Sequence, residues 1–388
     1  MENFRFSLPT NIIFGDHAEE EAGRMTSEYG TRALILYGSE RIRKNGLLGK
    51  IEEQLAEHGV SCETFGGITE NPLLSVAEQI CDLVRKKQFD VLLAVGGGSV
   101  IDTAKAVSIG SCTETPLWDF YDQKAIPQNA LPIGVVLTMA ATASEANCTS
   151  VITNDRIHKK TVMGCPLTFP KFALLNPKLT FTVPPKQTAI GAIDIFSHAF
   201  ERYFHLGQKG TLRRHLCTSV MKTVLEELPK AQENPEDYES RSQLMWAATV
   251  AHSDMIGTDG VFACHEMSHI LTEEFGLPHG TALAILMPAW CSYMLPDHTA
   301  ELAEFARDVW GVSGVGRPEE HVAREGILRF QRFLASRGLP LTLSEAGIES
   351  VSSRELADKT VSESGFLGES FAKLYRRDLQ EIYEFARG

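Results

Sequence analysis

The sequence predicts an α/β domain built on a parallel β-sheet, followed by an all-helical domain. In the first half of the chain, short runs rich in β-branched residues alternate with segments of helical periodicity, which is typical of a parallel sheet flanked by helices. After Val183-Pro184-Pro185 these runs disappear and long helical patterns follow. The double proline therefore predicts a boundary between a domain of residues 1–184 and a domain of residues 185–388.

The individual elements follow from apolar runs and from the amphipathic segments between them. In the first domain, buried strands are expected at residues 33–37, 91–95, 133–137 and 172–175. Helices are expected there at residues 46–58, 72–87 and 100–108. In the second domain, helices are expected at residues 187–204, 211–228 and 240–253, and the helical pattern continues through residues 354–387.

Composition narrows the class of protein. The chain has 388 residues, of which 43% are hydrophobic and 22% charged, as in an ordinary globular protein rather than a disordered or fibrous one. The net charge of −13 is spread out and no lysine- or arginine-rich block occurs, which argues against a nucleic-acid partner. Neither a signal-peptide pattern nor an apolar run of membrane-spanning length is present, so a cytoplasmic location is expected.

A glycine loop follows the strand at 91–95. Gly96-Gly97-Gly98-Ser99 leads directly into a helix, and such a loop lets backbone amides and the helix amino terminus approach an anion. We expect a pyrophosphate cradle here, since a plain strand-to-helix turn needs one glycine rather than three. Asp102, in the first turn of this helix, suits either a ribose hydroxyl or the helix dipole.

A second polar cluster, Thr138 to Glu145, follows the strand at 133–137. Its hydroxyls could contact phosphate, nicotinamide or substrate, or could cap a helix.

Acidic and imidazole side chains gather in the second half of the chain. Asp194 and His198 are four residues apart in a segment of helical character, so they share one face. Burying this pair is costly without a partner, which a divalent cation or a direct hydrogen bond could provide. Three more histidines, at 265, 269 and 279, lie within fifteen residues, and together these side chains favour a metal site.

A rival interpretation is a zinc hydrolase, because His265-Glu266-Met267-Ser268-His269 matches the H-E-x-x-H pattern. The extended metzincin form needs Gly and His where Thr272 and Phe275 stand, but the short form remains open. Hydrolase chemistry leaves the glycine loop and the Asp194/His198 pair unexplained.

These residues together resemble the iron-containing alcohol dehydrogenase family, in particular its butanol dehydrogenase and broad-range aldehyde reductase branch. The resemblance covers the whole chain, from Pro9-Thr-Asn-Ile-Ile-Phe-Gly15 through Gly96-Gly-Gly-Ser-Val-Ile-Asp-Thr-Ala-Lys105 to His279-Gly280. It implies a Rossmann-like amino-terminal domain and a helical metal-binding domain, as in the dehydroquinate synthase-like fold. It also implies a homodimer.

The resemblance assigns roles to particular residues. One Fe²⁺ or Zn²⁺ would be held by Asp194, His198, His265 and His279, and would bind the substrate oxygen. His269 would then be a proton-relay or positioning group. The residues expected to contact the dinucleotide are Gly38, Ser39, Asn71, Gly97, Gly98, Ser99, Asp102, Thr138, Thr142, Ser144 and Lys160.

The coenzyme and the reaction are expectations of the same kind. Members that prefer NAD tend to carry Asp just after the first strand, where this chain has Gly38-Ser39-Glu40-Arg41 with Arg43 and Lys44 nearby. We therefore expect NADP(H) rather than NAD(H), and reduction of aldehydes to primary alcohols. The family usually has Gly where this chain has Ala143. A non-redox enzyme of the dehydroquinate synthase type is the alternative, and a nucleotide-binding sensor without turnover is a third.

Overall fold

The computed structural model describes residues 6–205, 212–257, 262–349, 351–361, 366–367 and 371–388. Within these residues the chain forms two compact units, which are described separately. The sheet unit comprises residues 6–183 and 236–254, and the helical unit comprises the described parts of 184–235 and 255–388. The predicted domains, 1–184 and 185–388, stay a prediction. In the structure the segment 236–254, which falls in the second predicted domain, packs with the sheet unit.

A parallel sheet forms the centre of the first unit. In the described part of the chain it has six strands in the order β1-β8-β5-β4-β2-β3. The strands are β1 (Asn11–Phe14), β2 (Arg32–Tyr37), β3 (Ser61–Phe65), β4 (Val91–Gly96), β5 (Ile133–Leu137) and β8 (Phe172–Leu175). From β2 the chain moves outward to β3 and then returns to the other side of β2 as β4, so the strand order reverses between β2 and β4.

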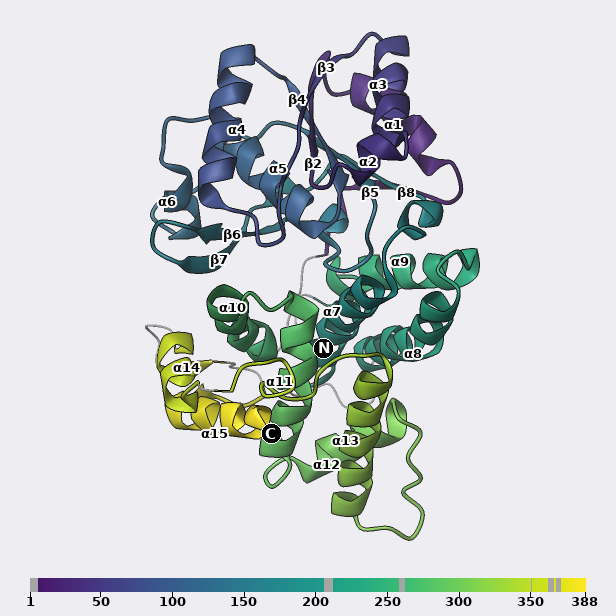
Figure 1. The fold of residues 1–388 in the computed structure, drawn as a ribbon, viewed down its shortest axis with the longest axis vertical. Helices are drawn as coiled ribbons and strands as arrows, with labels where there is room; N and C mark the ends of the chain where they lie inside the picture. The colour runs from purple at the N-terminus through teal and green to yellow at the C-terminus, as the bar shows by residue number, and fades with distance from the viewer. Residues whose placement is uncertain (1–5, 206–211, 258–261, 350, 362–365, 368–370) are drawn as a thin grey trace. The chain divides into compact units, whose positions relative to one another are not determined.

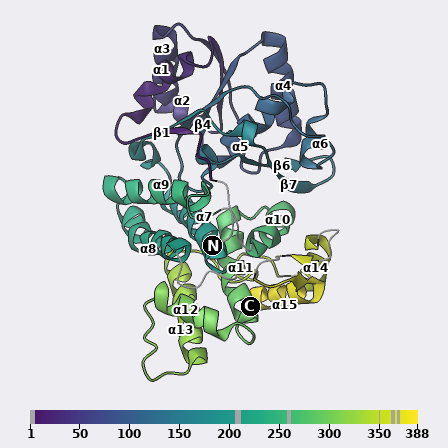
Figure 2. The same ribbon diagram turned by 180° about the vertical axis from the view of Figure 1, so that it is seen from behind.

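Helices cover both faces of this sheet (Figures 1 and 2). On one face lie α4 (Leu74–Lys87) and α5 (Gly98–Gly110), and on the other α1 (Ala22–Ser27) and α3 (Leu47–Glu57). This unit also contains α2 (Arg41–Lys44), α6 (Leu117–Tyr121), α9 (Tyr238–His252), four short 3-10 helices and the antiparallel hairpin of β6 (Thr149–Asn154) and β7 (Lys159–Gly164).

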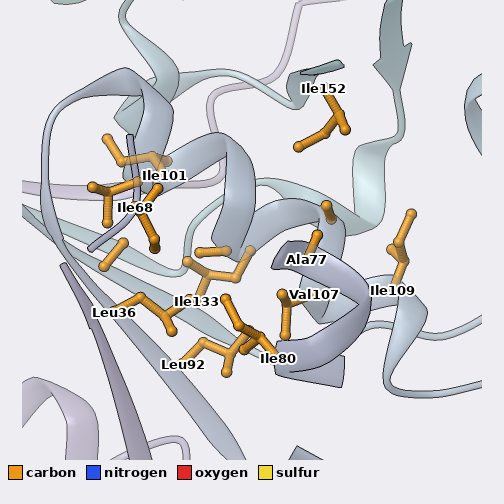
Figure 3. Packing of buried hydrophobic residues seen from close by; sticks show 14 of the residues in the cluster. Leu36, Ile68, Ala77, Ile80, Leu92, Ile101, Val107, Ile109, Ile133 and Ile152 are labelled. Atoms are coloured by element: carbon orange, nitrogen blue, oxygen red, sulfur yellow. The ribbon is translucent and has the colours of Figure 1, made fainter. Parts of the chain in front are cut away.

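Strand alternation divides the apolar side chains between the two faces. In β2, Leu34 and Leu36 pack toward α4 and α5, whereas Ala33 and Ile35 pack toward α1 and α3. Figure 3 shows the first of these cores, where strand residues such as Leu92 meet helix residues. Because both faces are covered, β2, β4, β5 and β8 are almost entirely buried, which explains their continuous apolar runs.

The second unit is built from helices. They are α7 (Pro185–Tyr203), α8 (Leu212–Glu233), α10 (Ala263–Phe275), α11 (His279–Met294), α12 (Thr299–Asp308), α13 (Glu319–Ser336), α14 (Ser353–Thr360) and α15 (Arg376–Arg387). Helix α7 packs against α8 and α11, and α10 packs against α11. Pro185 occupies the first turn of α7, where its missing N–H leaves no hydrogen bond unmade.

The predicted fold class is confirmed, and the structure corrects some of the predicted elements. Strands β1 and β3 and the β6–β7 hairpin were not predicted. The helical pattern expected through 354–387 is interrupted by two short strands, β9 (Phe366–Leu367) and β10 (Leu374–Tyr375). No helix in the described part of the chain is long and apolar enough to span a membrane.

Candidate functional site

Helices α7, α10 and α11 bring the four predicted metal ligands together. The Nε2 atoms of three histidines lie close to Asp194 Oδ1, at 3.9 Å for His198, 3.8 Å for His265 and 3.5 Å for His279. The ligand atoms of Asp194, His198 and His265 all lie within 4.8 Å of one another, and His279 is outside this tighter group. The cluster therefore joins an i, i+4 pair on α7 to the first turns of α10 and α11.

Burial makes this cluster unusual for charged groups. The side chains of Asp194 and His198 are 5% and 4% exposed, and that of His265 is 12% exposed. Asp194 Oδ1 and His265 Nε2 have no hydrogen-bond partner among the described residues. Buried polar atoms without a partner are rare in proteins, and a carboxylate with several imidazoles is a ligand set that divalent iron and zinc accept. These residues therefore fit a divalent cation.

Helix packing at Gly280 positions His279. A Cβ atom on Gly280 would lie 2.1 Å from the carbonyl oxygen of Ile190 on α7, so only glycine permits this close approach of α11. His279 is the preceding residue, and Nδ1 of its ring lies 3.1 Å from the hydroxyl of Ser268 on α10. That hydroxyl already donates to the His265 carbonyl at 2.6 Å, so it accepts from Nδ1 and leaves Nε2 of His279 facing Asp194.

Glu201, which the sequence reasoning missed, lies directly behind His265. Its Oε2 contacts Nδ1 of His265, and its Oε1 accepts the backbone N–H of Cys264 at 2.6 Å. Burial works to lower the pKa of His265, but the carboxylates of Glu201 and Asp194 outweigh it and raise that pKa to about 9. The cluster thus attracts positive charge. The available signal was spacing, because Glu201 follows Asp194 by seven residues on the same helix face.

His269 lies near this cluster without joining the tighter group of ligand atoms. Its ring centroid is 6.2 Å from that of His279, and its Nδ1 is 3.8 Å from Glu266. A zinc hydrolase of the H-E-x-x-H type would require His265 and His269 to bind the same ion. Instead, His265 Nε2 faces Asp194 of α7, so the arrangement gives the hydrolase alternative no support.

Several of the predicted dinucleotide residues lie at the carboxyl ends of β2, β4 and β5. Gly38 and Ser39 follow β2, Gly97 follows β4, and Thr138 follows β5 and donates its amide to the Gly96 carbonyl at 3.0 Å. These strands are parallel neighbours, so their carboxyl ends meet at one edge of the sheet. In open α/β sheets, ligands bind at this edge where the strand order reverses, which here is between β2 and β4.

Helix α5 begins within the glycine loop, at Gly98. Its first amides, including those of Gly98 and Ser99, have no acceptor within the helix and are available to an anion. A Cβ on Gly98 would lie 2.5 Å from Thr142 Oγ1, so glycine is required for Thr142 to approach. The structure therefore places Thr142 directly against the loop.

A buried polar network fixes two further predicted residues. The hydroxyl of Ser144 donates to Asp102 at 2.6 Å and accepts from Lys105 at 2.7 Å. Lys105 is fully buried and also donates to Asn147 Oδ1 at 2.9 Å and to the Thr149 carbonyl at 2.8 Å. Burial lowers the pKa of Lys105 to about 8, against the opposing effect of Asp102. The sequence did not predict Asn147 or Lys105. Lys105 was missed because a lysine in a helix is more often exposed.

Two other predicted contacts meet each other. Lys160, on β7, donates to Asn71 Oδ1 at 3.0 Å, although 89 residues separate them. Asn71 has a φ of 54°, a left-handed conformation that asparagine tolerates better than most residues. Ala143 also has a positive φ, of 52°, at the position where glycine was expected. The Ala143 side chain is buried. Its left-handed backbone conformation costs about 1 kcal/mol more for alanine than for glycine.

Comparisons with known proteins agree with this architecture. The family "Iron-containing alcohol dehydrogenase" matches residues 9–177, and "Fe-containing alcohol dehydrogenase family, C-terminal" matches residues 188–387. The chain is 36% identical to a probable NADH-dependent butanol dehydrogenase 1 of Bacillus subtilis, over 98% of this chain and 99% of that protein. It is 34% identical to the NADPH-dependent aldehyde reductase YqhD of Escherichia coli, over 100% of both chains.

Solved structures give the same result. The crystal structure of an NADH-dependent butanol dehydrogenase A from Thermotoga maritima superposes with a TM-score of 0.94 and is 32% identical, covering 100% of this chain and 99% of that one. None of these similarities supports the non-redox alternative. The protein is an oxidoreductase, and it belongs to the iron-containing alcohol dehydrogenase family.

Proposed function

We propose that this enzyme interconverts primary alcohols and aldehydes by hydride transfer with a nicotinamide cofactor, and that four side chains hold one Fe²⁺ or Zn²⁺ ion. The four are Asp194, His198, His265 and His279. The observation that carries this proposal is the set of three imidazole Nε2 atoms 3.5–3.9 Å from Asp194 Oδ1. Ligands about 2.1 Å from a tetrahedral ion are about 3.4 Å apart, close to these separations.

The cation supplies Lewis-acid polarisation of the carbonyl group when it is bound. The protein's own groups hold the reactants. The amides at the start of α5 suit the pyrophosphate, and the hydroxyls of Thr138 and Thr142 at the carboxyl edge of the sheet suit the nicotinamide half. His269, whose side chain is 18% exposed, is proposed as the group that passes a proton to or from the substrate oxygen.

We also propose a preference for NADP(H) and for aldehyde reduction. Glu40 would repel a 2′-phosphate, but its carboxylate accepts a 2.9 Å hydrogen bond from Tyr37 and lies 3.4 Å from Arg43. The negative charge is therefore partly balanced. Arg43 itself is half exposed on α2, the short helix that follows β2, where a guanidinium suits a phosphate group.

Turnover of NADPH and NADH with butyraldehyde tests this proposal. Protein stripped of metal should consume neither cofactor, and addition of Fe²⁺ or Zn²⁺ should restore activity, with a higher kcat/KM for NADPH. A ratio in favour of NADH would contradict the coenzyme preference alone. If metal binds stoichiometrically and no simple aldehyde or primary alcohol is turned over, the proposed reaction is wrong. The homodimer and the cytoplasmic location stay predictions.

A further inference from the structure

Glu201 is a buried carboxylate that touches a proposed metal ligand without being one. It is 1% exposed and lies on α7 one turn beyond His198. Both of its oxygens are engaged, one by Nδ1 of His265 and the other by the amide of Cys264 at 2.6 Å. Because both oxygens of the Glu201 carboxylate are hydrogen-bonded to residues at the start of α10, this carboxylate is placed to control the orientation of the His265 ring.

The chemistry of this contact determines which nitrogen of His265 carries a proton. An ionised carboxylate can only accept hydrogen bonds, so the contact to Glu201 requires a proton on Nδ1. In the neutral ring the lone pair is then on Nε2, which lies 3.8 Å from Asp194 Oδ1. A metal ligand must present a lone pair to the ion, and the partner of the other nitrogen selects the tautomer.

Charge balance gives a second argument. Three neutral imidazoles and Asp194 would leave one positive charge of a divalent cation uncompensated. Among the described residues, Glu201 is the second buried carboxylate beside this cluster, since Glu266 has a side chain that is 49% exposed. With Asp194 and Glu201 both ionised, the site with its cation is electrically neutral, and buried charges are tolerated when they are paired in this way.

We propose that Glu201 is a positioning residue that sets the metal affinity of the site by holding His265 in the Nδ1–H tautomer. This inference rests on the proposed metal site. A purely structural role is the competing explanation, because Glu201 also anchors the first turn of α10 through the Cys264 amide.

The substitution Glu201→Gln separates the two roles. A glutamine can keep an oxygen facing the Cys264 amide, which preserves the anchor. Its NH₂ group then faces Nδ1 of His265 and can only donate, so the proton of the neutral ring moves to Nε2. The metal-facing nitrogen would lose its lone pair while the fold stays intact. We expect the affinity for Zn²⁺ to fall by about 10- to 100-fold, the usual effect of losing such a partner.

The experiment compares metal-free wild type, Glu201→Gln and the matched control Glu226→Gln, which makes the same change at an exposed position of α8. Zn²⁺ affinity is measured by competition with a chromophoric chelator, and thermal unfolding is recorded without metal. Weakened Zn²⁺ binding with an unchanged melting temperature, in Glu201→Gln only, supports the proposal. If wild type and Glu201→Gln bind Zn²⁺ equally, the role of Glu201 is overturned.

A different result identifies failure of the metal site itself. If wild type binds no Zn²⁺, the proposed function fails at the site and the role of Glu201 fails with it. Should Glu201→Gln not fold, the Zn²⁺-loaded wild type with ¹⁵N-labelled histidine still decides the question. A His265 ring protonated at Nδ1 supports the proposal, and a ring that binds the ion through Nδ1 overturns it.

Discussion

Lys105 Nζ lies 2.7 Å from the hydroxyl of Ser144, and this contact joins the helix of the glycine loop to the segment that follows β5. The ammonium group makes two more hydrogen bonds, so all three of its protons are used inside the protein. The ends of β4 and β5 are therefore held together by a buried charge. A dinucleotide bound at this edge of the sheet would contact segments whose relative position Lys105 maintains.

The stability of the protein should depend on pH through Lys105. Its pKa falls from the usual 10.5 to about 8 in the folded state, mainly because of burial. Between pH 8 and 10.5 Lys105 is protonated in the unfolded chain but largely neutral in the folded protein, so the free energy of unfolding rises with pH across this window. Below pH 8 Lys105 is protonated in both states and no longer makes the stability depend on pH. The pKa difference corresponds to about 3 kcal/mol.

Chemical denaturation from pH 7.5 to 10.5 checks this prediction, with Lys105→Met as the comparison. The difference in unfolding free energy between wild type and variant should grow in favour of wild type as the pH rises. Titrating groups that do not interact with Lys105 affect both proteins alike and cancel, whereas Asp102, Glu145 and Cys148 interact with it and contribute to the difference. A difference that stays constant across the window would show that Lys105 has an ordinary pKa.

Substitution of Gly98 should weaken dinucleotide binding. In Gly98→Ala the new methyl group would lie 2.5 Å from Thr142 Oγ1, so either the loop or Thr142 must move. We expect the Kd for NADPH, measured by fluorescence titration, to rise at least about tenfold, as a loss of about 1.4 kcal/mol implies. Gly49→Ala is the control, because nothing lies within 4 Å of its Cβ and alanine favours helix α3. Equal affinities for all three proteins would exclude the steric argument.

Gly280→Ala tests the helix contact that positions His279. The added Cβ would lie 2.1 Å from the Ile190 carbonyl, so α11 must move away from α7. Overpacking of this kind costs about 1–3 kcal/mol of unfolding free energy. Zn²⁺ affinity should fall as well, since His279 moves away from Asp194. Stability is measured by denaturation of the metal-free protein, and an unchanged Zn²⁺ affinity would separate His279 from the metal site.

The sequence predicted those features of the fold and of the site that depend on the periodicity of neighbouring residues. The strands β5 and β8 are found at the predicted residues, because a sheet covered on both faces requires short continuous apolar runs. The four-residue spacing of Asp194 and His198 correctly placed both side chains on one helix face. These features are encoded within a few neighbouring residues.

Features that depend on distant partners were not predictable in this way. Strand β1 has four residues and pairs with β8, some 160 positions later, so its short run carried little signal of its own. Lys105 and Glu201 are charged residues in helices, where exposure is the ordinary expectation. Their burial becomes evident only when the partners, Ser144 and His265, are placed in space.

Two histidine substitutions should separate metal binding from proton transfer. In His279→Ala the site loses a ring whose Nε2 lies 3.5 Å from Asp194, so both Zn²⁺ affinity and kcat should fall. In His269→Ala the tighter ligand group stays intact, so we expect unchanged Zn²⁺ affinity with kcat lower by about 10²- to 10⁴-fold, the usual contribution of a general acid or base. Chelator competition and steady-state kinetics on both variants give the comparison. If His269→Ala loses zinc as His279→Ala does, His269 is a ligand and the assignment of the four ligands must change.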